Sequence, residues 1–350
     1  MLIATPNITV DRTIRLPELR PGEVLRPSRA VVTAGGKGLN VGRVAAALGR
    51  RATLVGLRSE VDGDLLDRLF AVEPVELVGV SIAAETRVST IYLEDSGRVT
   101  VLNEPGPLLT PADWDRYELA VASALATGRH ESLVCSGSLP PGAPDDAYGR
   151  LVGVGHCAGV RVVVDGARTA LATALLAGPD VVTPNLAEAL GVLAGQTNEA
   201  VSEAGPDVAR RACDAVIALC ARGARTAAVT AGAAGTAYGD AHDVVWVPTV
   251  PVAVVNPIGA GDSFVGGLVH ALEQGQGGRD AVVFAVAVAT ASVEQELAGG
   301  VDPARARQLE AEVRALVAPS PFMSAICTSE VQIADLNAQA GTDTATPPAG

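Results

Sequence analysis

The sequence predicts an α/β protein in which a mostly parallel sheet lies between layers of helices, with a small set of extra strands beside it. Three observations lead to this fold class. Short apolar runs alternate with helix-like segments along most of the chain, hydrophobic residues make up 48% of its 350 residues, and part of the first third departs from the alternation. Alternating strands and helices produce βαβ units, whose parallel strands are covered by helices on both faces.

The core strands are predicted at short apolar runs, because such runs suit buried strands and are too short for helices. They lie at 2–5, 52–57, 132–136, 161–165, 180–183 and 226–230. Helices are predicted at 39–49, 110–128 and 207–223. The second helix has a clear start signal, with Thr110 as N-cap, Pro111 at the first helical position and Asp113 in the first turn.

A group of strands without intervening helices interrupts this pattern. They are predicted at 13–19, 29–34 and 89–103, the last a hairpin across the sequence DSG. We expect a small β flap beside the main sheet, approximately within 13–34 and 86–103. Flaps over a site commonly exclude water, and the alternative is an edge extension with no such role.

The length and the end of the chain predict one large domain followed by a tail. The domain is expected to span residues 1–317, a size within reach of a single α/β domain. Residues 318–350 are rich in Ser, Thr, Ala, Gly and Pro and have no sustained hydrophobic period. That composition is typical of a flexible segment.

The composition also excludes several classes of function. The formal net charge of −13 argues against nucleic acid as a partner, because an acidic protein repels an extended phosphate backbone. The five cysteines are scattered without zinc-ligand spacing, which favours reduced thiols. The sequence has neither a signal-peptide pattern nor an unbroken apolar span, so we expect a cytoplasmic protein with no membrane partner.

The segment NPIGAGDSFVGG, residues 256–267, places a carboxylate at a predicted helix start. The apolar residues that follow recur with helical spacing, so Gly259, Ala260 and Gly261 lie at the helix N-terminus. Free N–H groups and the helix dipole attract an anion there. An ionised Asp262 can accept the proton of a hydroxyl that attacks a phosphoryl group. The alternative is an ordinary N-cap aspartate after a glycine-rich turn.

A second glycine loop, TAGGKGLNVG at 33–42, has glycine spacing that fits neither a P-loop nor a dinucleotide-binding loop. Lys37 and Asn40 nevertheless give it a polar, cationic edge at a helix start. A surface loop without function is the alternative.

A third loop, at 229–239, follows a strand and carries Thr230, Gly232 and Gly235. It suits nucleotide phosphates, with a plain turn as the alternative.

One polar pair lies at another predicted helix start. In TPNLAEAL, Asn185 and Glu188 are three residues apart and therefore share one face. Their oxygen atoms suit Mg²⁺ bound through water. The same spacing also fits a capping box, with Asn185 as N-cap and Glu188 reaching back to it.

Together these segments resemble the ribokinase-like sugar kinases, also called the PfkB family, over roughly residues 1–315. GGKGLNVGRVAAALG resembles the N-terminal glycine signature of the family, and NPIGAGDSFVGGLVHAL resembles the C-terminal one. The segments at 5–13, 86–95, 103–107 and 136–142 resemble the branch that includes 1-phosphofructokinase and tagatose-6-phosphate kinase. The resemblance implies a ribokinase-like three-layer α/β/α sandwich with a β-strand lid, and ATP and Mg²⁺ as cosubstrates.

The resemblance also implies roles for residues at matching positions. Asp262 matches the catalytic base, and Gly259, Ala260 and Gly261 match the anion hole. Asp11, Gly36 and Asn40 match sugar contacts, and Arg87, Ser138, Arg26 and Lys37 are candidates near the existing phosphate of the substrate. Thr230, Gly232, Gly235 and Asn185 match nucleotide contacts, and Glu188 and Asn185 match the element that orders the metal.

The activity implied is ATP-dependent phosphorylation of a sugar phosphate, with fructose 1-phosphate giving fructose 1,6-bisphosphate as the first choice. Tagatose 6-phosphate, fructose 6-phosphate, another sugar, a cyclitol or a nucleoside are alternative substrates. A non-catalytic sensor of sugar phosphates is an alternative of another class. The family also suggests a monovalent cation near the anion hole, and exposed lid edges suit a homodimer.

Four positions differ from many members of the family. Thr183 stands where Lys is common, Pro257 stands where Thr is common, and Glu294 and Glu296 stand where small or neutral residues are commoner. These differences bear on nucleotide preference and on the identity of the substrate.

Overall fold

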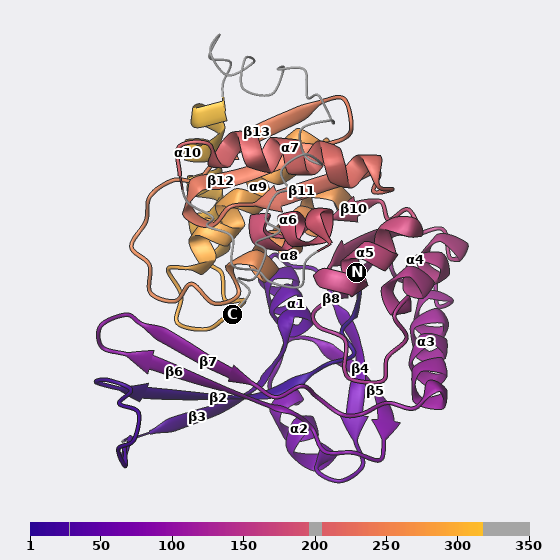
Figure 1. Ribbon diagram of the computed structural model, residues 1–350, viewed down its shortest axis with the longest axis vertical. Coiled ribbons are helices and arrows are strands. Elements are labelled where there is room, and N and C mark those ends of the chain that lie inside the picture. Colours follow the sequence, from indigo (N-terminus) through magenta and orange to yellow (C-terminus); the bar gives the residue numbers. More distant parts are fainter. Residues whose placement is uncertain (28, 196–204, 318–350) are drawn as a thin grey trace, which may run out of the picture.

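The computed structural model describes residues 1–27, 29–195 and 205–317. The tail predicted at 318–350 lies outside the described residues. The main sheet contains strands β1 (Leu2–Ala4), β4 (Thr53–Ser59), β5 (Glu76–Ile82), β8 (Ser132–Ser136), β9 (Arg161–Asp165), β10 (Val181–Val182), β11 (Thr226–Thr230), β12 (Gly235–Gly239) and β13 (Val244–Pro248). Within the described ranges their order across the sheet is β13-β12-β11-β10-β9-β8-β1-β4-β5 (Figure 1).

The pairing of these strands is mostly parallel, as the alternating pattern predicts. Every pair from β11 to β5 is parallel, whereas β12 and β13 add an antiparallel hairpin at one edge. The carboxyl ends of the parallel strands therefore face one edge of the sheet. In open sheets of this kind ligands bind at that edge.

Ten helices in the described part of the chain cover the sheet. They are α1 (Lys37–Ala47), α2 (Gly63–Phe70), α3 (Pro111–Leu125), α4 (Ala147–Cys157), α5 (Arg168–Leu176), α6 (Leu186–Ala194), α7 (Val208–Ala221), α8 (Ala260–Glu273), α9 (Gly278–Ser292) and α10 (Pro303–Val317). None of the helices in these ranges is long and apolar enough to cross a bilayer.

Alternate residues of the strands divide the core into two layers. In β1, Ile3 packs into the cluster that includes α1, α2, α8, α9 and α10, whereas Leu2 and Ala4 pack into the cluster of α3 to α7. The same alternation places Val163 of β9 on the first face and Val164 on the second. Because successive side chains of a strand point to opposite faces, a sheet covered on both sides needs apolar residues at every position.

A separate four-stranded sheet extends from the main body and forms the lid (Figure 1). Its strands are β2 (Thr9–Leu16), β3 (Ala30–Gly35), β6 (Val88–Glu94) and β7 (Val99–Asn103), in the order β3-β2-β6-β7. The hairpin predicted at 89–103 is the antiparallel pair β6 and β7. The strand predicted at 13–19 is wrong in its bounds. It begins at Thr9 and ends before Pro17, because proline has no N–H group for strand pairing.

Several elements were not predicted from the pattern, including β5, α9 and α10. The reason is clearest for α9, in which eleven of the fifteen residues are buried. A helix that is apolar all round shows no polar face, so the amphipathic period that identifies helices is missing. The predicted signals at helix ends are present, for example Gly49, which follows α1 with a φ of 81°.

Candidate active site

The start of α8 lies at the carboxyl edge of the sheet and has an open N-terminus. Gly259 is the N-cap and adopts a left-handed conformation, with a φ of 82°, and no side chain among the described residues caps the helix. A Cβ on Gly259 would lie 3.2 Å from Ala298, so both the conformation and the space favour glycine. The Ala260 N–H makes a long bond of 3.4 Å to the Pro257 carbonyl oxygen. Because no side chain in the described ranges caps this helix start, its first N–H groups can face an anion.

Asp262 lies in the first turn of this helix and is buried, with 6% of its surface exposed. Asn40 Nδ2 donates a hydrogen bond to Asp262 Oδ2 at 2.7 Å. Burial is the main cause that raises the pKa of the Asp262 carboxyl to about 7. The charge of Lys37 and the Asn40 bond oppose this rise, and the carboxylates of Asp165 and Glu188 add to it. A carboxyl with this pKa can gain and lose a proton near neutral pH.

Asp165 is a member of the site that sequence reasoning missed. It ends β9, is buried, and accepts a hydrogen bond from Ser136 Oγ at 3.0 Å. Lys37 Nζ lies 3.7 Å from Asp165 Oδ2 and 3.8 Å from Glu188 Oε1, so this ammonium lies between two carboxylates. The available signal was the carboxylate that directly follows the buried run VVV, at the edge where ligands bind.

The start of α6 contains the capping box that was one of two interpretations of Asn185 and Glu188. Asn185 Oδ1 accepts from the Glu188 N–H at 2.8 Å, and Glu188 Oε2 accepts from the Asn185 N–H at 2.9 Å. Asn185 also forms a bridge with Thr230, which ends β11. The structure thus brings Asn185, Glu188 and Thr230 together, close to Lys37.

The two glycines after Thr230 border a short 3₁₀ turn, Gly232–Ala234, between β11 and β12. Gly232 has a φ of 51°, and Gly235 has a φ of 143°. A Cβ on Gly235 would lie 2.5 Å from the Val247 carbonyl oxygen. Close packing against β13 therefore explains this glycine without a ligand.

The predicted sugar-binding residues lie where the lid meets the main body. The Asp11 carboxyl in β2 covers Gly35, where a Cβ would come within 2.1 Å of Asp11 Cγ. Gly36, with a φ of 112°, is the N-cap of α1, whose first residues carry Lys37 and Asn40. Burial raises the pKa of Asp11, whereas its bond from Thr9 and the nearby arginines lower it.

Arg87 and Ser138 are joined through a third residue, Asn7. Arg87 donates to the Asn7 carbonyl oxygen from Nε at 3.2 Å and from Nη2 at 2.8 Å. The Asn7 Nδ2 group donates to Ser138 Oγ at 3.0 Å. Burial lowers the pKa of Arg87, while Asp11 and Glu104 oppose that effect. The guanidinium is therefore held in place beside the predicted sugar site.

Arg26 is not brought together with Arg87. It is exposed, on the loop between β2 and β3. Figure 1 shows this loop at the end of the lid that lies away from the main body. Because β2 and β6 pair in parallel, with Val10 opposite Val88, Arg87 lies at the end of the lid nearest the main body.

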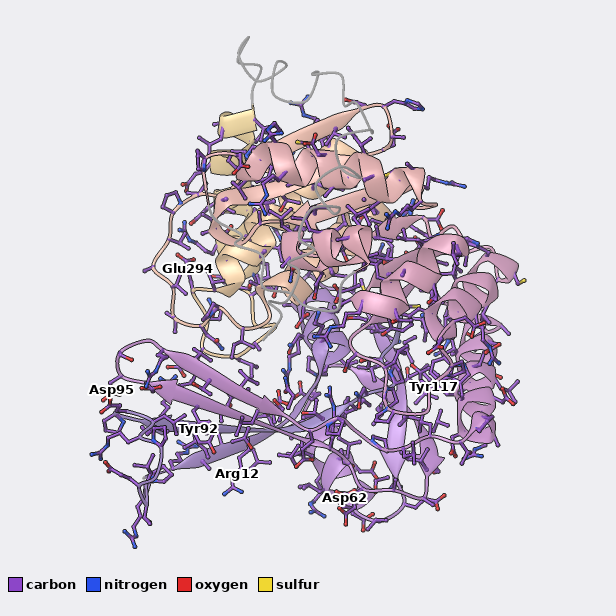
Figure 2. All side chains as sticks on the ribbon, in the orientation of Figure 1. Arg12, Asp62, Tyr92, Asp95, Tyr117 and Glu294 are labelled. Atoms are coloured by element: carbon purple, nitrogen blue, oxygen red, sulfur yellow. The ribbon has the colours of Figure 1, made fainter. Side chains whose placement is uncertain are left out.

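The positions that differ from the family have the following surroundings. Thr183 is buried, and its hydroxyl has no hydrogen-bond partner in the described ranges. Glu294 forms an ion pair with Arg305 at 2.9 Å, and the Glu296 carbonyl oxygen accepts from Asn256 at 2.9 Å. Figure 2 shows Glu294 on the same side of the molecule as the lid residues Tyr92 and Asp95.

The donor set of the site suits a metal that takes ligands mainly from phosphates and water. Among residues 1–27, 29–195 and 205–317, no group of three or more His, Cys, Asp or Glu side chains could hold a metal ion. One carboxylate oxygen of Glu188 is occupied by the capping box, and the other faces Lys37. Mg²⁺ usually keeps several waters and binds substrate phosphates through few carboxylates, so this set is compatible with it.

The fold and the site together define an ATP-dependent carbohydrate kinase. The family described as pfkB family carbohydrate kinase matches residues 4–305, and the chain belongs to that family.

Named relatives and solved structures agree with this assignment. The chain is 34% identical to 1-phosphofructokinase of Rhodobacter capsulatus over 275 residues, which cover 77% of this chain and 82% of that protein. It is 31% identical to 1-phosphofructokinase of Escherichia coli K12, over 85% of this chain and 92% of that protein. Phosphofructokinase-2 of Escherichia coli, solved in complex with potassium, superposes with a TM-score of 0.79 at 26% identity, covering 90% of this chain and 99% of that one.

Proposed function

We propose that this protein transfers the terminal phosphoryl group of ATP to a hydroxyl of fructose 1-phosphate, giving fructose 1,6-bisphosphate and ADP. The observation that carries the proposal is the buried Asp262 carboxyl at the open start of α8. The choice of acceptor is supported by two relatives named 1-phosphofructokinase, at 34% and 31% identity.

In this mechanism Asp262 accepts the proton of the sugar hydroxyl. The hydroxyl oxygen forms a bond to the terminal phosphorus of ATP, and the bond from that phosphorus to the bridging oxygen breaks, so ADP leaves. The N–H groups at Gly259, Ala260 and Gly261 face the charge on the transferred group. Because Asn40 holds one carboxylate oxygen at 2.7 Å, the other oxygen is the one that receives the proton.

Arg87 is the proposed ligand of the phosphate that the substrate already carries. Its bonds to the Asn7 carbonyl oxygen orient the guanidinium, and Ser138 lies on the other side of Asn7. A protein with a net charge of −13 needs such a local cation to hold an anionic sugar. Asp11, Gly36 and Asn40 are proposed to contact the sugar hydroxyls. Arg26 can contribute to binding of this phosphate only if the end of the lid that carries it approaches the site.

The nucleotide is proposed to lie along Thr230, Gly232 and Gly235, with its phosphates toward α8. Asn185 and Glu188 are the proposed residues that order Mg²⁺ through water. When bound, Mg²⁺ would neutralise charge on the ATP phosphates. A monovalent cation near the anion hole is also proposed, since the solved phosphofructokinase-2 of Escherichia coli contains potassium.

The lid is proposed to cover the sugar and to serve as a dimer contact. Val31 and Val101 are apolar and 41–42% exposed, and strand pairing places them in one row on the same face of the lid. Val32 and Leu102, 43% and 58% exposed, lie in the neighbouring row on the opposite face. Exposed apolar residues of this kind suit a protein interface. One solved form of phosphofructokinase-2 of Escherichia coli is described as tetrameric. The oligomeric state of this protein can be measured by light scattering.

The experiment that tests the activity is an ADP-release screen across hexose, pentose and cyclitol phosphates, with free sugars and nucleosides as neutral acceptors. We expect the highest kcat/KM for fructose 1-phosphate and a kcat about a thousandfold lower with Asp262→Asn. A higher kcat/KM for another acceptor would identify that compound, and not fructose 1-phosphate, as the substrate. If wild type and variant are equally inactive across the panel, the result favours the alternative function, a non-catalytic sensor of sugar phosphates. Binding measurements with the sugar phosphates would then test that function.

The Arg87→Ala variant tests the nature of the acceptor. We expect it to raise KM for the sugar phosphate about a hundredfold, the scale of one lost charge-assisted pair, with a smaller change in KM for ATP. An unchanged KM for the sugar phosphate would instead indicate that the natural substrate is neutral.

A further inference from the structure

Arg43 lies buried beside the candidate site and bonds to Asn40, the partner of Asp262. It is in α1, 6% exposed, one turn after Asn40. Its Nε donates to Glu73 Oε2 at 2.8 Å and its Nη2 to Glu73 Oε1 at 2.5 Å. A paired, bidentate guanidinium of this kind has a fixed plane.

The remaining donors of Arg43 determine how the Asn40 amide is oriented. Arg43 Nη1 donates to Asn40 Oδ1 at 3.0 Å. That bond occupies the oxygen of the amide, so the NH₂ group points to Asp262 Oδ2 at 2.7 Å. If the amide were reversed, its NH₂ group would face the guanidinium and its oxygen would face the carboxylate, and both contacts would be repulsive.

The same guanidinium also connects the segments that surround Asn40. Nη2 donates to the Ala34 carbonyl oxygen at 3.0 Å, at the end of lid strand β3, and Nη1 donates to the Ala298 carbonyl oxygen at 3.1 Å. The loop that carries Ala298 packs on Asn40, since a Cβ on Gly299 would lie 2.6 Å from Asn40 Cα. Arg43 therefore uses two donors on Glu73, one on the Asn40 amide and two on carbonyl oxygens of the neighbouring segments.

We propose that Arg43, anchored by Glu73, is a positioning residue of the kinase reaction that acts through the orientation of Asn40 on the protonation of Asp262. The inference rests on the proposed function, because Asp262 acts there as the base. An Asn40 N–H bond stabilises the ionised carboxylate, so a disordered or reversed amide would keep Asp262 protonated to higher pH.

Other charged groups also face Asp262 and must be kept unchanged in a test. Lys37 comes from α1, Asp165 from β9 and Glu188 from the start of α6. None of them is altered by a substitution at Arg43 or Glu73. Arg43 also lowers the pKa of Asp11, so Arg43→Met is expected to affect sugar binding as well, whereas Arg43→Lys keeps the charge.

The test compares Arg43→Lys, Arg43→Met and Glu73→Gln with matched controls on a neighbouring pair. Arg58 donates to Asp67 from Nε at 3.0 Å and from Nη2 at 2.5 Å, away from Asn40. Arg58→Met and Asp67→Asn therefore remove a pair with the same bidentate geometry at a more exposed position. For the Arg43 variants we expect kcat to fall ten- to a hundredfold and its acid limb to move up by about one pH unit. Glu73→Gln should give a smaller change of the same sign, and the controls should leave the limb in place.

A double-mutant cycle with Asn40→Ala separates positioning from general packing. If Arg43 acts through Asn40, Arg43→Lys moves the acid limb in the wild-type background and leaves it unmoved in the Asn40→Ala background. An equal movement in both backgrounds, or no movement in either, overturns the proposal. Arg43→Lys and Glu73→Gln decide the question if Arg43→Met does not fold.

A second measurement reads the same carboxyl without turnover. The difference in unfolding free energy between a protein with Asp262 and its Asp262→Asn counterpart changes with pH until Asp262 is fully ionised in the folded state. In the Arg43→Lys background we expect this change to continue to higher pH. The measurement still decides the role of Arg43 if the substrate panel shows no kinase activity, so failure of the activity and failure of the positioning are distinguishable.

Discussion

Two helices begin at the same edge of the sheet with a carboxylate in the first turn, but they use it in different ways. At α6, the Asn185 and Glu188 side chains satisfy backbone N–H groups of their own helix start. At α8, Asp262 turns to Asn40 on another helix, and no side chain in the described ranges caps the start. At the start of α6, side chains of the same helix bind the backbone N–H groups. At the start of α8, the N–H groups can bind an anion.

This contrast explains why the two carboxylates suit different tasks. Glu188 is stabilised as an ion by backbone N–H donation and by nearby Lys37, which suits a group that orders a metal. Asp262 is buried and accepts from Asn40, and burial raises its pKa to about 7. A base must change its protonation during the reaction, so a pKa near the working pH is an advantage.

The largest expected effect comes from removing the charge at the open start. Asp262→Asn should lower kcat by about a thousandfold, because general-base catalysis contributes on the order of 10² to 10⁴. Steady-state kinetics with saturating ATP and sugar phosphate measures this effect. A loss of less than tenfold would mean that the hydroxyl loses its proton to another group.

A smaller effect is expected from filling the space in front of the open N–H groups. Gly261 is exposed, and nothing lies within 4 Å of a Cβ built on it, so Gly261→Ala should fold normally. If a phosphoryl group occupies that space, kcat should fall about tenfold or more, consistent with the cost of a displaced donor. Gly153→Ala in α4 is the control, since Gly153 is equally exposed and has equal space. Equal kcat values for the two variants would contradict an anion at the start of α8.

The raised pKa of Asp262 predicts the pH dependence of both activity and stability. The folded pKa of about 7 lies above the ordinary value of 3.8, so the folded protein binds more protons than the unfolded chain between these values. Its contribution to stability is therefore present at low pH and is lost as the pH rises toward 7. We expect kcat/KM to fall below about pH 7 and Asp262→Asn to raise Tm at pH 8 but not near pH 4. If the Tm difference between Asp262→Asn and wild type were the same at pH 4 and pH 8, burial would not destabilise the ionised form of this carboxyl.

The smallest expected effect comes from opening the closed start of α6. Asn185→Ala should lower the free energy of unfolding by about 1 kcal/mol, the usual cost of an N-cap. Glu188→Gln keeps an oxygen that can accept from the Asn185 N–H, so it should preserve stability while raising the Mg²⁺ concentration needed for half-maximal rate. Thermal unfolding and a Mg²⁺ titration of kcat measure the two effects. Loss of stability in Glu188→Gln without a change in the Mg²⁺ requirement would leave this residue a purely structural role.

Part of the site could be predicted from the sequence because its determinants are local. The N-cap of α6, the left-handed Gly259 and the first-turn position of Asp262 depend on residues within a few positions of one another. The alternating apolar runs likewise predict a parallel sheet, since each strand must be buried on both faces. Asp165 was missed because the order of the strands in the sheet decides which side chains lie near a carboxylate at a strand end.

The sequence was sufficient to define where α3, α6 and α8 begin, and that the anion-attracting start of α8 carries a carboxylate. Tertiary packing decided which partner that carboxylate has and how its proton is held. Asn40 and Asp262 are 222 residues apart, and Arg43 reaches Ala298 across 255 residues. Desolvation and the direction of a buried amide depend on groups brought together only by the folded core, so no local pattern in the chain encodes them.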